Sequence, residues 1–433
     1  MDFNKKKVRK TNNKLIDKMI ADYENRKINY HSMARYYAGD HDIKYQYNKF
    51  PNRSNQVVVD NFINKFVNEE VQYSLGNPLS YVSLSGDNDI IKAIYKNTFH
   101  WNENHNQEVL RTLEIYGTAY LLHYIDNKGR FSERILHPEN AIVYCDSDNV
   151  PQRFIHFYTL KYDEAKYKDV YYPDGRIIVY KNNTEYKQKT NPFKGIPVTV
   201  CKLEKIEDTI YFKIKELQDA YNEILSDQVN TISDYRRAYL VISGVQVTEE
   251  TEKLLKTSGI INLPSSSNSS AKWLLKDVPD GYIENNLNRL RNAMYEATNH
   301  IDGNEKLQSN TSGTALRNRL VFLEQRCNLM LAVVVNSIYE RLERLFEYLE
   351  IKGQNFDIAD IKINSSPCVP KDEISIIQGL VQLGIGDNIS LETALSRLPF
   401  IENPAQEIEK IKAERKLNER IELDKIEKYG DAA

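Results

Sequence analysis

Apolar residues recur every three or four positions through much of this chain, which is the period of helices with one buried face. The longest such pattern consists of Leu316, Leu320, Leu323, Cys327, Leu331, Val334, Ile338, Leu342, Leu345 and Leu349. At 1.5 Å per residue, the pattern predicts one continuous helix of roughly 50 Å. Few compact domains contain a helix of this length.

Helical spacing also occurs on both sides of this stretch. It predicts helices over 13–38, 56–75, 89–115, 210–237, 283–301, 372–383, 391–398 and 404–428. Between them, 117–203 is rich in aliphatic and aromatic residues and contains two turn signals, which predicts a mostly antiparallel β region. Residues 238–282 combine short apolar segments with a Ser/Asn-rich loop, which predicts a small mixed module inserted between two helices. The predicted fold class is α+β, mainly helical.

The segment 302–313 is almost wholly polar, although strong helical patterns flank it. Its candidate contact residues are Lys306, Gln308, Ser309, Asn310 and Thr311. One charge and several small hydrogen-bonding groups can contact phosphates without reading a base sequence. A surface loop with no binding role is the alternative interpretation.

Composition excludes several classes of protein. The net charge of -3 over 433 residues argues against a protein that wraps DNA with a dense basic patch, although DNA can still slide past such a chain. The four cysteines form no close pair in sequence, so we expect reduced, buried thiols. The basic N-terminus has no apolar segment behind it, and no apolar run approaches the ~20 residues of a membrane span.

Catalytic and metal-binding motifs give no support for an enzyme. No Gly-rich phosphate-binding pattern is present. The pair Asp146 and Asp148 lacks the Gly and distal Glu of a calcium loop, so a turn is the preferred interpretation. His100 and His105 lie five residues apart, which is not the spacing of a zinc helix. We therefore expect no catalytic residues, no cofactor and no metal, and Ser312 is expected to cap the long helix.

The order of several short phrases resembles the portal proteins of tailed double-stranded DNA phages of Gram-positive bacteria. These phrases are Asp60-Asn61-Phe62-Ile63, Gly76-Asn77-Pro78, Ile115-Tyr116-Gly117-Thr118-Ala119-Tyr120, Leu136-His137-Pro138-Glu139, Asn191-Pro192-Phe193-Lys194-Gly195-Ile196-Pro197-Val198, Asp219-Ala220-Tyr221-Asn222, Ser226-Asp227, Tyr239-Leu240-Val241-Ile242 and Ser312-Gly313-Thr314-Ala315-Leu316 followed by Leu323-Glu324. The resemblance covers roughly residues 30–415.

This resemblance implies a phage portal fold with wing, stem, clip and crown regions and one very long spine helix. The implied regions are 1–116 and 117–209 for the helical and β-rich parts of the wing, 210–237 and 283–301 for the stem helices, 238–282 for the clip, 302–313 for the tunnel loop, 314–370 for the long wing helix and return strand, and 371–433 for the crown and C-terminal tail.

The implied function is a head-tail connector, a dodecameric ring at one capsid vertex of the virion, assembled in the host cytoplasm, through which DNA is packaged and ejected. The implied partners are other copies of the chain, double-stranded DNA without sequence preference, the terminase large subunit, connector or adaptor proteins, scaffold and major capsid protein, with no membrane. Lys306 is the first candidate for a phosphate contact, and Arg289 and Arg291 on the second stem helix are further candidates, although either arginine could instead pair with an acidic residue between subunits.

Two other functions are compatible with parts of the pattern. A minor capsid or head-morphogenesis protein would bind virion proteins without forming a channel, but it would not need a polar loop between two stem helices. A nuclease would need a cluster of carboxylates on matching elements, and the sequence places none. Formation of a ring distinguishes a portal from a minor capsid or head-morphogenesis protein. Metal-dependent cleavage of DNA would identify a nuclease.

Overall fold

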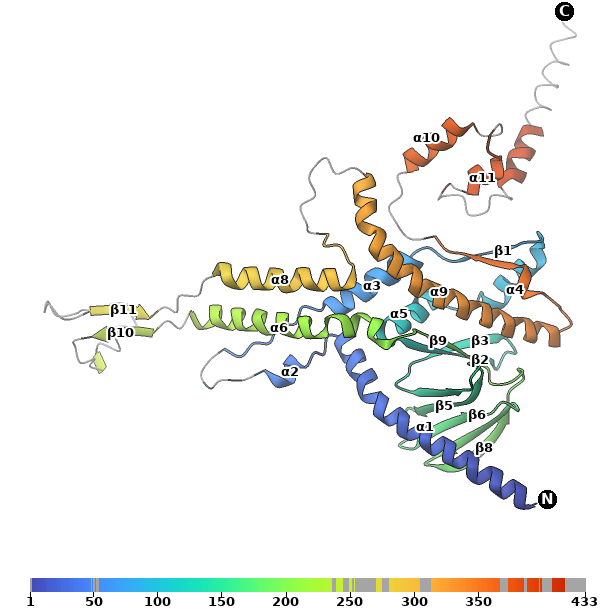
Figure 1. Ribbon diagram of the computed structural model, residues 1–433, viewed down its shortest axis with the longest axis horizontal. Helices are drawn as coiled ribbons and strands as arrows, with labels where there is room; N and C mark the ends of the chain where they lie inside the picture. Colours follow the sequence, from blue (N-terminus) through green and yellow to red (C-terminus); the bar gives the residue numbers. More distant parts are fainter. Residues whose placement is uncertain are drawn as a thin grey trace, which may run out of the picture. The chain divides into compact units, whose positions relative to one another are not determined.

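The computed structural model of the chain consists of two compact units, Met1–Pro367 and Cys368–Ala433. It describes residues 2–47, 54–235, 239–243, 270–274, 280–303, 313–366, 373–384, 388–396 and 407–416, with the single residues 49, 51, 249, 250, 253 and 398. The first unit contains the sheets and helices α1 to α9, and the second contains α10 and α11 (Figure 1). The predicted fold class, α+β with a majority of helix, is confirmed.

Five helices precede the main sheets. They are α1 (Asp2–Tyr37), α2 (Ile43–Gln46), α3 (Phe62–Leu75), α4 (Asn88–Thr98) and α5 (His105–Tyr116). The helix predicted over 56–75 begins only at Phe62, and residues 54–60 before it are not helical. The prediction of one helix over 89–115 is wrong, because the chain turns after Thr98 and resumes as α5. The turn places the ring of Trp101 against that of Phe131, with the centroids 5.9 Å apart, so burial of an aromatic ring outweighs helix continuation.

The end of α5 determines where the β region begins. Gly117 has a φ of 68°, in the left-handed region, and its N–H bonds to the carbonyl of Leu113. A Cβ at this position would lie 3.2 Å from Cγ1 of Ile206. Both the dihedral angle and the close approach therefore favour glycine, and strand β2 starts at the next residue.

The β region is antiparallel throughout. In one sheet, β2 (Thr118–Ile125) lies between β3 (Phe131–Leu136) and β9 (Val198–Lys202). A second sheet has the order β4 (Ala141–Cys145), β5 (Pro151–Thr159), β6 (Lys166–Tyr171), β7 (Arg176–Lys181) and β8 (Thr184–Thr190). This confirms the expected antiparallel β region. Strand β8 is exposed at every position, so no apolar alternation in the sequence marks it within this region.

Long-range contacts join segments that are distant in sequence. Helix α1 packs against the five-stranded sheet through Ile16, Met19 and Tyr23. The strand β1 (Ser80–Ser83), which the sequence pattern did not predict, pairs with β12 (Ile361–Asn364). The first unit is therefore closed by pairing between its N-terminal and C-terminal parts.

The longest helix, α9 (Gly313–Ile351), is continuous over 39 residues, as predicted. Between Leu320 and Ile351 it is long and apolar enough to cross a membrane by length and composition, which corrects our expectation that no segment approaches such a span. One face packs in the main core through residues such as Val334, Ile338 and Leu345. Packing in the core accounts for this apolar composition without a membrane.

Two arginines on α9 are buried with carboxylates from earlier elements. Nε of Arg326 donates to Oε1 of Glu70 at 2.7 Å, and its Nη2 lies 3.4 Å from Oε2 of Glu114. Burial, followed by the neighbouring charge of Glu70, raises the pKa of Glu114 well above its usual range. A protonated Glu114 can donate to Glu70, so this cluster holds no unpaired charge.

The second arginine, Arg341, binds Glu133 on β3 in a bidentate manner, with both distances 2.8 Å. His105 contacts the same carboxylate at 2.8 Å. Burial alone would raise the pKa of Glu133, but Arg341, His105 and His123 outweigh it and hold this pKa well below its usual range. Glu133 is therefore ionised and Glu114 is not, although both are buried.

Several smaller predictions also have outcomes. Oδ1 of Asp146 accepts from the backbone N–H of Asp148 and of Val150, so this pair forms the expected turn. Cys201 and Cys327 are buried free thiols, whereas Cys145 is half-buried. Cys368 lies outside the described residues.

The second unit is helical where the structure describes it. It contains α10 (Glu373–Leu383), α11 (Leu391–Ser396) and a helical segment over 407–416. Its buried apolar residues include Leu380, Ala394 and Leu395. These helices agree with the three predicted after residue 371.

The opposite ionisation of Glu114 and Glu133 predicts opposite effects of two isosteric substitutions. We expect Glu133→Gln to lower the free energy of unfolding by about 3–5 kcal/mol at pH 7, because Arg341 loses its charged partner. Glu114→Gln should leave it unchanged or raise it, because the amide resembles the protonated acid and does not have to take up a proton at pH 7. Urea unfolding followed by circular dichroism measures both.

The same pair gives a pH test. The folded-state pKa of Glu133 is lowered from 4.5, so its stabilisation is complete above pH 4.5 and is lost as the pH falls towards the folded-state pKa. Glu114 has a raised pKa, so it reduces stability as the pH rises above 4.5. Glu133→Gln should reduce the loss of stability that wild-type protein shows as the pH falls below 4.5. Glu114→Gln should reduce the loss of stability that wild-type protein shows as the pH rises above 4.5. Equal effects of the two variants would contradict the assignment.

Candidate nucleic-acid interface on the helix pair α6 and α8

Two long helices carry the candidate interface. Helices α6 (Ile210–Tyr235) and α8 (Asp280–Thr298) lie side by side and run in opposite directions (Figure 1). They agree with the helices predicted over 210–237 and 283–301. The strands β10 (Tyr239–Ser243) and β11 (Ser270–Leu274) form an antiparallel pair in the chain between them. Most of the rest of the module predicted over 238–282 lies outside the described residues.

The helix pair is acidic rather than basic. Helix α6 carries five carboxylates and two lysines, and α8 carries three carboxylates and two arginines. A duplex has one charge per about 1.7 Å of its axis, so such helices do not provide the dense basic surface that holds DNA tightly.

The two candidate arginines on α8 have different environments. Arg289 is exposed and forms no ion pair within the part of the chain that the structure describes. Arg291 is half-buried, and its Nη2 lies 2.7 Å from Oδ2 of Asp302. Its guanidinium also lies over the ring of Tyr295, at 5.8 Å from the centroid. Arg291 thus links α8 to the beginning of segment 302–313, whereas Arg289 is available to a partner.

The five loop candidates cannot be placed in the same way. Lys306, Gln308, Ser309, Asn310 and Thr311 all lie outside the described residues, as does the predicted cap Ser312. Their role therefore remains a prediction from the sequence. The ion pair between Arg291 and Asp302 is the described polar contact that lies nearest in sequence before these five residues.

One face of α6 binds an extended segment through a regular series of hydrogen bonds. The side chains of Gln218, Asn222, Ser226, Asn230 and Asp234 accept from the backbone N–H groups of Phe62, Asp60, Val58, Gln56 and Ser54, in that order, at 2.7–3.0 Å. We call this series the polar ladder. Its members Gln218, Asn222 and Ser226 are fully buried. The ladder satisfies backbone groups of segment 54–60 that would otherwise be buried without partners.

The ladder depends on a match between two structural repeats. Four residues of a helix advance about 6.0 Å along its axis, and two residues of an extended chain advance about 6.6 Å. Polar side chains at every fourth position of α6 therefore meet every second N–H of segment 54–60. The two chain segments run antiparallel, because residue numbers rise along α6 as they fall along 54–60.

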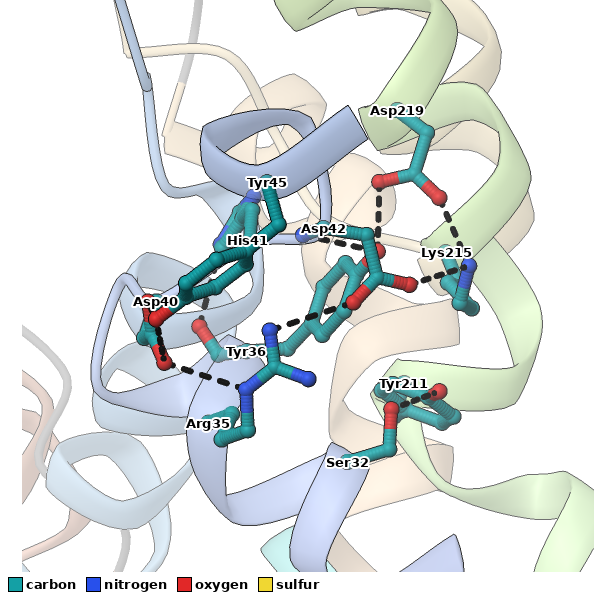
Figure 2. Close-up of polar contacts among 10 residues, drawn as sticks. All are labelled: Ser32, Arg35, Tyr36, Asp40, His41, Asp42, Tyr45, Tyr211, Lys215 and Asp219. Carbon is teal, nitrogen blue, oxygen red and sulfur yellow. Dashed lines mark hydrogen bonds and ion pairs between the residues drawn. The ribbon is translucent and has the colours of Figure 1, made fainter. Parts of the chain in front are cut away.

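A second polar cluster joins α6 to the end of α1 (Figure 2). The hydroxyl of Tyr36 donates to Asp219 at 2.8 Å, and Nζ of Lys215 donates to the same carboxylate at 2.7 Å. Ser32 and Tyr211 bond to each other at 2.8 Å one turn earlier. Burial, followed by the hydrogen bond to Asp219, raises the pKa of Tyr36, so its hydroxyl keeps its proton and remains a donor.

An open groove next to this cluster is lined mainly by acidic side chains. It includes Asp42, Asp219, Glu223 and Asp227, together with Lys215. Tyr47 donates to Asp227 at 2.6 Å, so several of these carboxylates are already hydrogen-bonded. Among the described residues, no three His, Cys, Asp or Glu side chains are arranged to hold a metal ion. The groove therefore suggests neither a metal centre nor a catalytic site.

The sequence analysis missed the polar ladder, although the sequence contains a signal for it. Polar residues of similar size recur at every fourth position from 218 to 234, on the face of α6 that would otherwise be read as solvent-exposed. Only the backbone of a distant segment makes these positions buried. The link between Arg291 and Asp302 was also not predicted, because it joins residues eleven apart across a helix end.

Comparison with known proteins gives a consistent result. The family model described as "Phage portal protein, SPP1 Gp6-like" matches residues 16–420. The portal protein of Bacillus phage SPP1 is 22% identical over 435 residues, covering 90% of this chain and 84% of that protein.

Two solved structures contain chains with low similarity to this one. The virion of a native gene transfer agent particle contains a chain with 13% identity and a TM-score of 0.46, covering 77% of this chain and 88% of that one. The neck of an empty gene transfer agent particle contains one with 12% identity and a TM-score of 0.49, covering 85% and 92%.

The polar ladder makes a prediction about stability. Replacing Asn222 with leucine, of similar size, leaves the N–H of Asp60 and the ring of His41 without their partner. We expect a loss of about 2–3 kcal/mol in the free energy of unfolding, because buried polar groups lose hydrogen bonds. Urea denaturation measures the loss.

A nearby exposed residue provides the control. Glu223→Ala lies next to Asn222 but outside the ladder, and it should change stability by less than about 0.5 kcal/mol. If both substitutions had the same small effect, the ladder would not be an important source of stability.

Proposed function

Because this chain belongs to the SPP1 Gp6-like family of phage portal proteins, we propose that copies of it form a closed ring of about twelve subunits around a channel for DNA. The ring would occupy one vertex of the capsid in the virion, after assembly in the host cytoplasm. The observation that carries the proposal is the match of the family model over residues 16–420, which includes both stem candidates, the loop and the long helix.

We assign the regions of the chain as follows. Residues 1–116 and 117–209 form the wing, 210–237 and 283–301 the stem helices, 238–282 the clip, 302–313 the tunnel loop, 314–370 the long wing helix and its return strand, and 371–433 the crown and tail. The clip is the surface for the terminase large subunit and later for connector proteins, and the wing is the surface for scaffold and major capsid protein. The excess of carboxylates on α6 supports the assignment of 210–237 as a stem helix beside the channel, because DNA must move through the channel without being held.

The proposed contacts with DNA divide into two groups. Lys306 and its polar neighbours Gln308, Ser309, Asn310 and Thr311 contact phosphates from the tunnel loop. Arg289 is the second contact, since it is exposed and unpaired within the described residues. Arg291 has a different role, because its ion pair with Asp302 holds the first residue of the loop against α8. The duplex moves through the portal, which itself hydrolyses no nucleotide.

The first test is electron microscopy of the purified protein. Class averages should show rings of about twelve subunits with an open centre, because closed rotational assembly repeats one head-to-tail interface. A concentration series distinguishes a stable ring from crowding on the grid. Monomers or small closed particles at high concentration would contradict the portal function and favour a head-assembly protein.

A second test concerns Lys306. In purified rings, Lys306→Ala should weaken binding of short duplexes by a similar factor for every base sequence, and it should flatten the dependence of affinity on salt, because one phosphate contact per engaged subunit is lost. Filter binding at several salt concentrations measures both quantities. Glu305→Ala changes the adjacent charge in the opposite direction and should not weaken binding. If Lys306→Ala had no effect on the salt dependence, Lys306 would not contact phosphate.

A further inference from the structure

The extended segment 54–60 has one edge against α6, and on its other edge Val57 and Val59 have no backbone partner within the described residues. The N–H groups of Gln56, Val58 and Asp60 bond to the polar ladder. Successive residues of an extended chain direct their N–H and C=O groups to opposite edges, so Val57 and Val59 present theirs away from α6. Neither residue has a backbone hydrogen bond within the described ranges, although both are half-buried. This edge can accept a second row of donors and acceptors.

The outer face of α8 carries side chains of the same chemistry at the same spacing. Asn288 and Asn292 are four residues apart and exposed, and neither has a hydrogen-bond partner among the residues that the structure describes. An asparagine amide provides both a donor and an acceptor, which is how Asn230 binds both the N–H and the C=O of Gln56. Exposed amides at this spacing on α8 therefore repeat the arrangement that α6 uses within the chain.

We propose that Asn288 and Asn292 of one copy bind the backbone of Val57 and Val59 in the neighbouring copy. Segment 54–60 would then lie between α6 of its own chain and α8 of the next. The helical advance of about 6.0 Å between the two asparagines matches the advance of about 6.6 Å between the two valines. This inference rests on the proposed ring, in which closed rotational symmetry brings two different surfaces of the chain together.

The directions of the chain segments agree with this contact. Segment 54–60 and α8 both run antiparallel to α6, so they run in the same direction as each other. In the proposed ring the rotation axis runs along α6 and α8, so α8 of one copy has the same direction as segment 54–60 of the next copy. Asn288 then lies opposite Val57, and Asn292 lies opposite Val59. Adjacent residues of a helix point about 100° apart, so Arg289 can still face the channel while Asn288 faces the neighbouring subunit.

Hydrogen exchange of the assembled ring tests the contact at single residues. In wild-type rings, the amides of Val57 and Val59 should exchange about as slowly as those of Gln56 and Val58. In the double variant Asn288→Ala/Asn292→Ala, the amides of Val57 and Val59 should exchange about tenfold faster, whereas those of Gln56 and Val58 should not change, because they bond to α6 of their own chain. The protein concentration at which half of the subunits are in rings should rise about tenfold.

The matched control is Asn25→Ala/Asn29→Ala, because Asn25 and Asn29 are also exposed and four residues apart on a helix. It should leave both exchange and assembly unchanged. Rings in which Val57 and Val59 exchange like exposed amides, or in which the double variant assembles like wild type, would overturn this inference and leave the portal function standing. Uniformly faster exchange of all four amides would also overturn it, since general loosening rather than a lost contact would then be the cause. If wild-type protein formed no ring, both proposals would be overturned.

Discussion

The position of α6 depends on the near equality of two distances, the advance of four residues of a helix and that of two residues of an extended chain. Because these distances agree to within about a tenth, α6 can bind the backbone of segment 54–60 at successive positions without distortion of either. The buried polar side chains of the ladder are stable only in this register. A shift of 54–60 by one residue would bring residues whose N–H groups point away from α6 opposite the ladder and leave each ladder oxygen without its donor. The ladder therefore determines the position of α6 relative to α3, which begins directly after the segment.

The long helix α9 is held in register by charge in addition to apolar packing. An apolar stripe alone permits a helix to slide by a turn of about 5.4 Å, because leucines and valines can exchange places at a modest free-energy cost. Arg326 and Arg341 prevent this, since either displacement would leave a buried charge unpaired. The carboxylates come from α3, α5 and β3, so one helix fixes three elements at once. A rigid frame of this kind suits a protein whose subunits must align around a common axis.

The sequence predicted the elements whose burial is periodic and missed those whose burial depends on distant partners. Helix α9 and the antiparallel strands between residues 117 and 203 follow from their apolar spacing. The break between α4 and α5 was missed because Trp101 turns the chain towards Phe131, a residue thirty positions away. Among the candidate site residues, Arg289 is exposed, whereas Arg291 pairs with Asp302. An ion pair across a helix end leaves no local signal in the sequence.

The sequence by itself determined the α+β class, the long helix, the acidic character of the α6 and α8 segments and the resemblance to portal proteins, because local periodicity, composition and ordered phrases are properties of the chain. Only the tertiary structure decided which polar residues are buried. Asn222 and Asn288 are the same amino acid on two amphipathic helices, yet one is buried against the backbone of 54–60 and the other is exposed. The difference arises because hydrogen-bond partners 162 residues apart are brought together by folding, and a buried amide is stable only where such a partner exists.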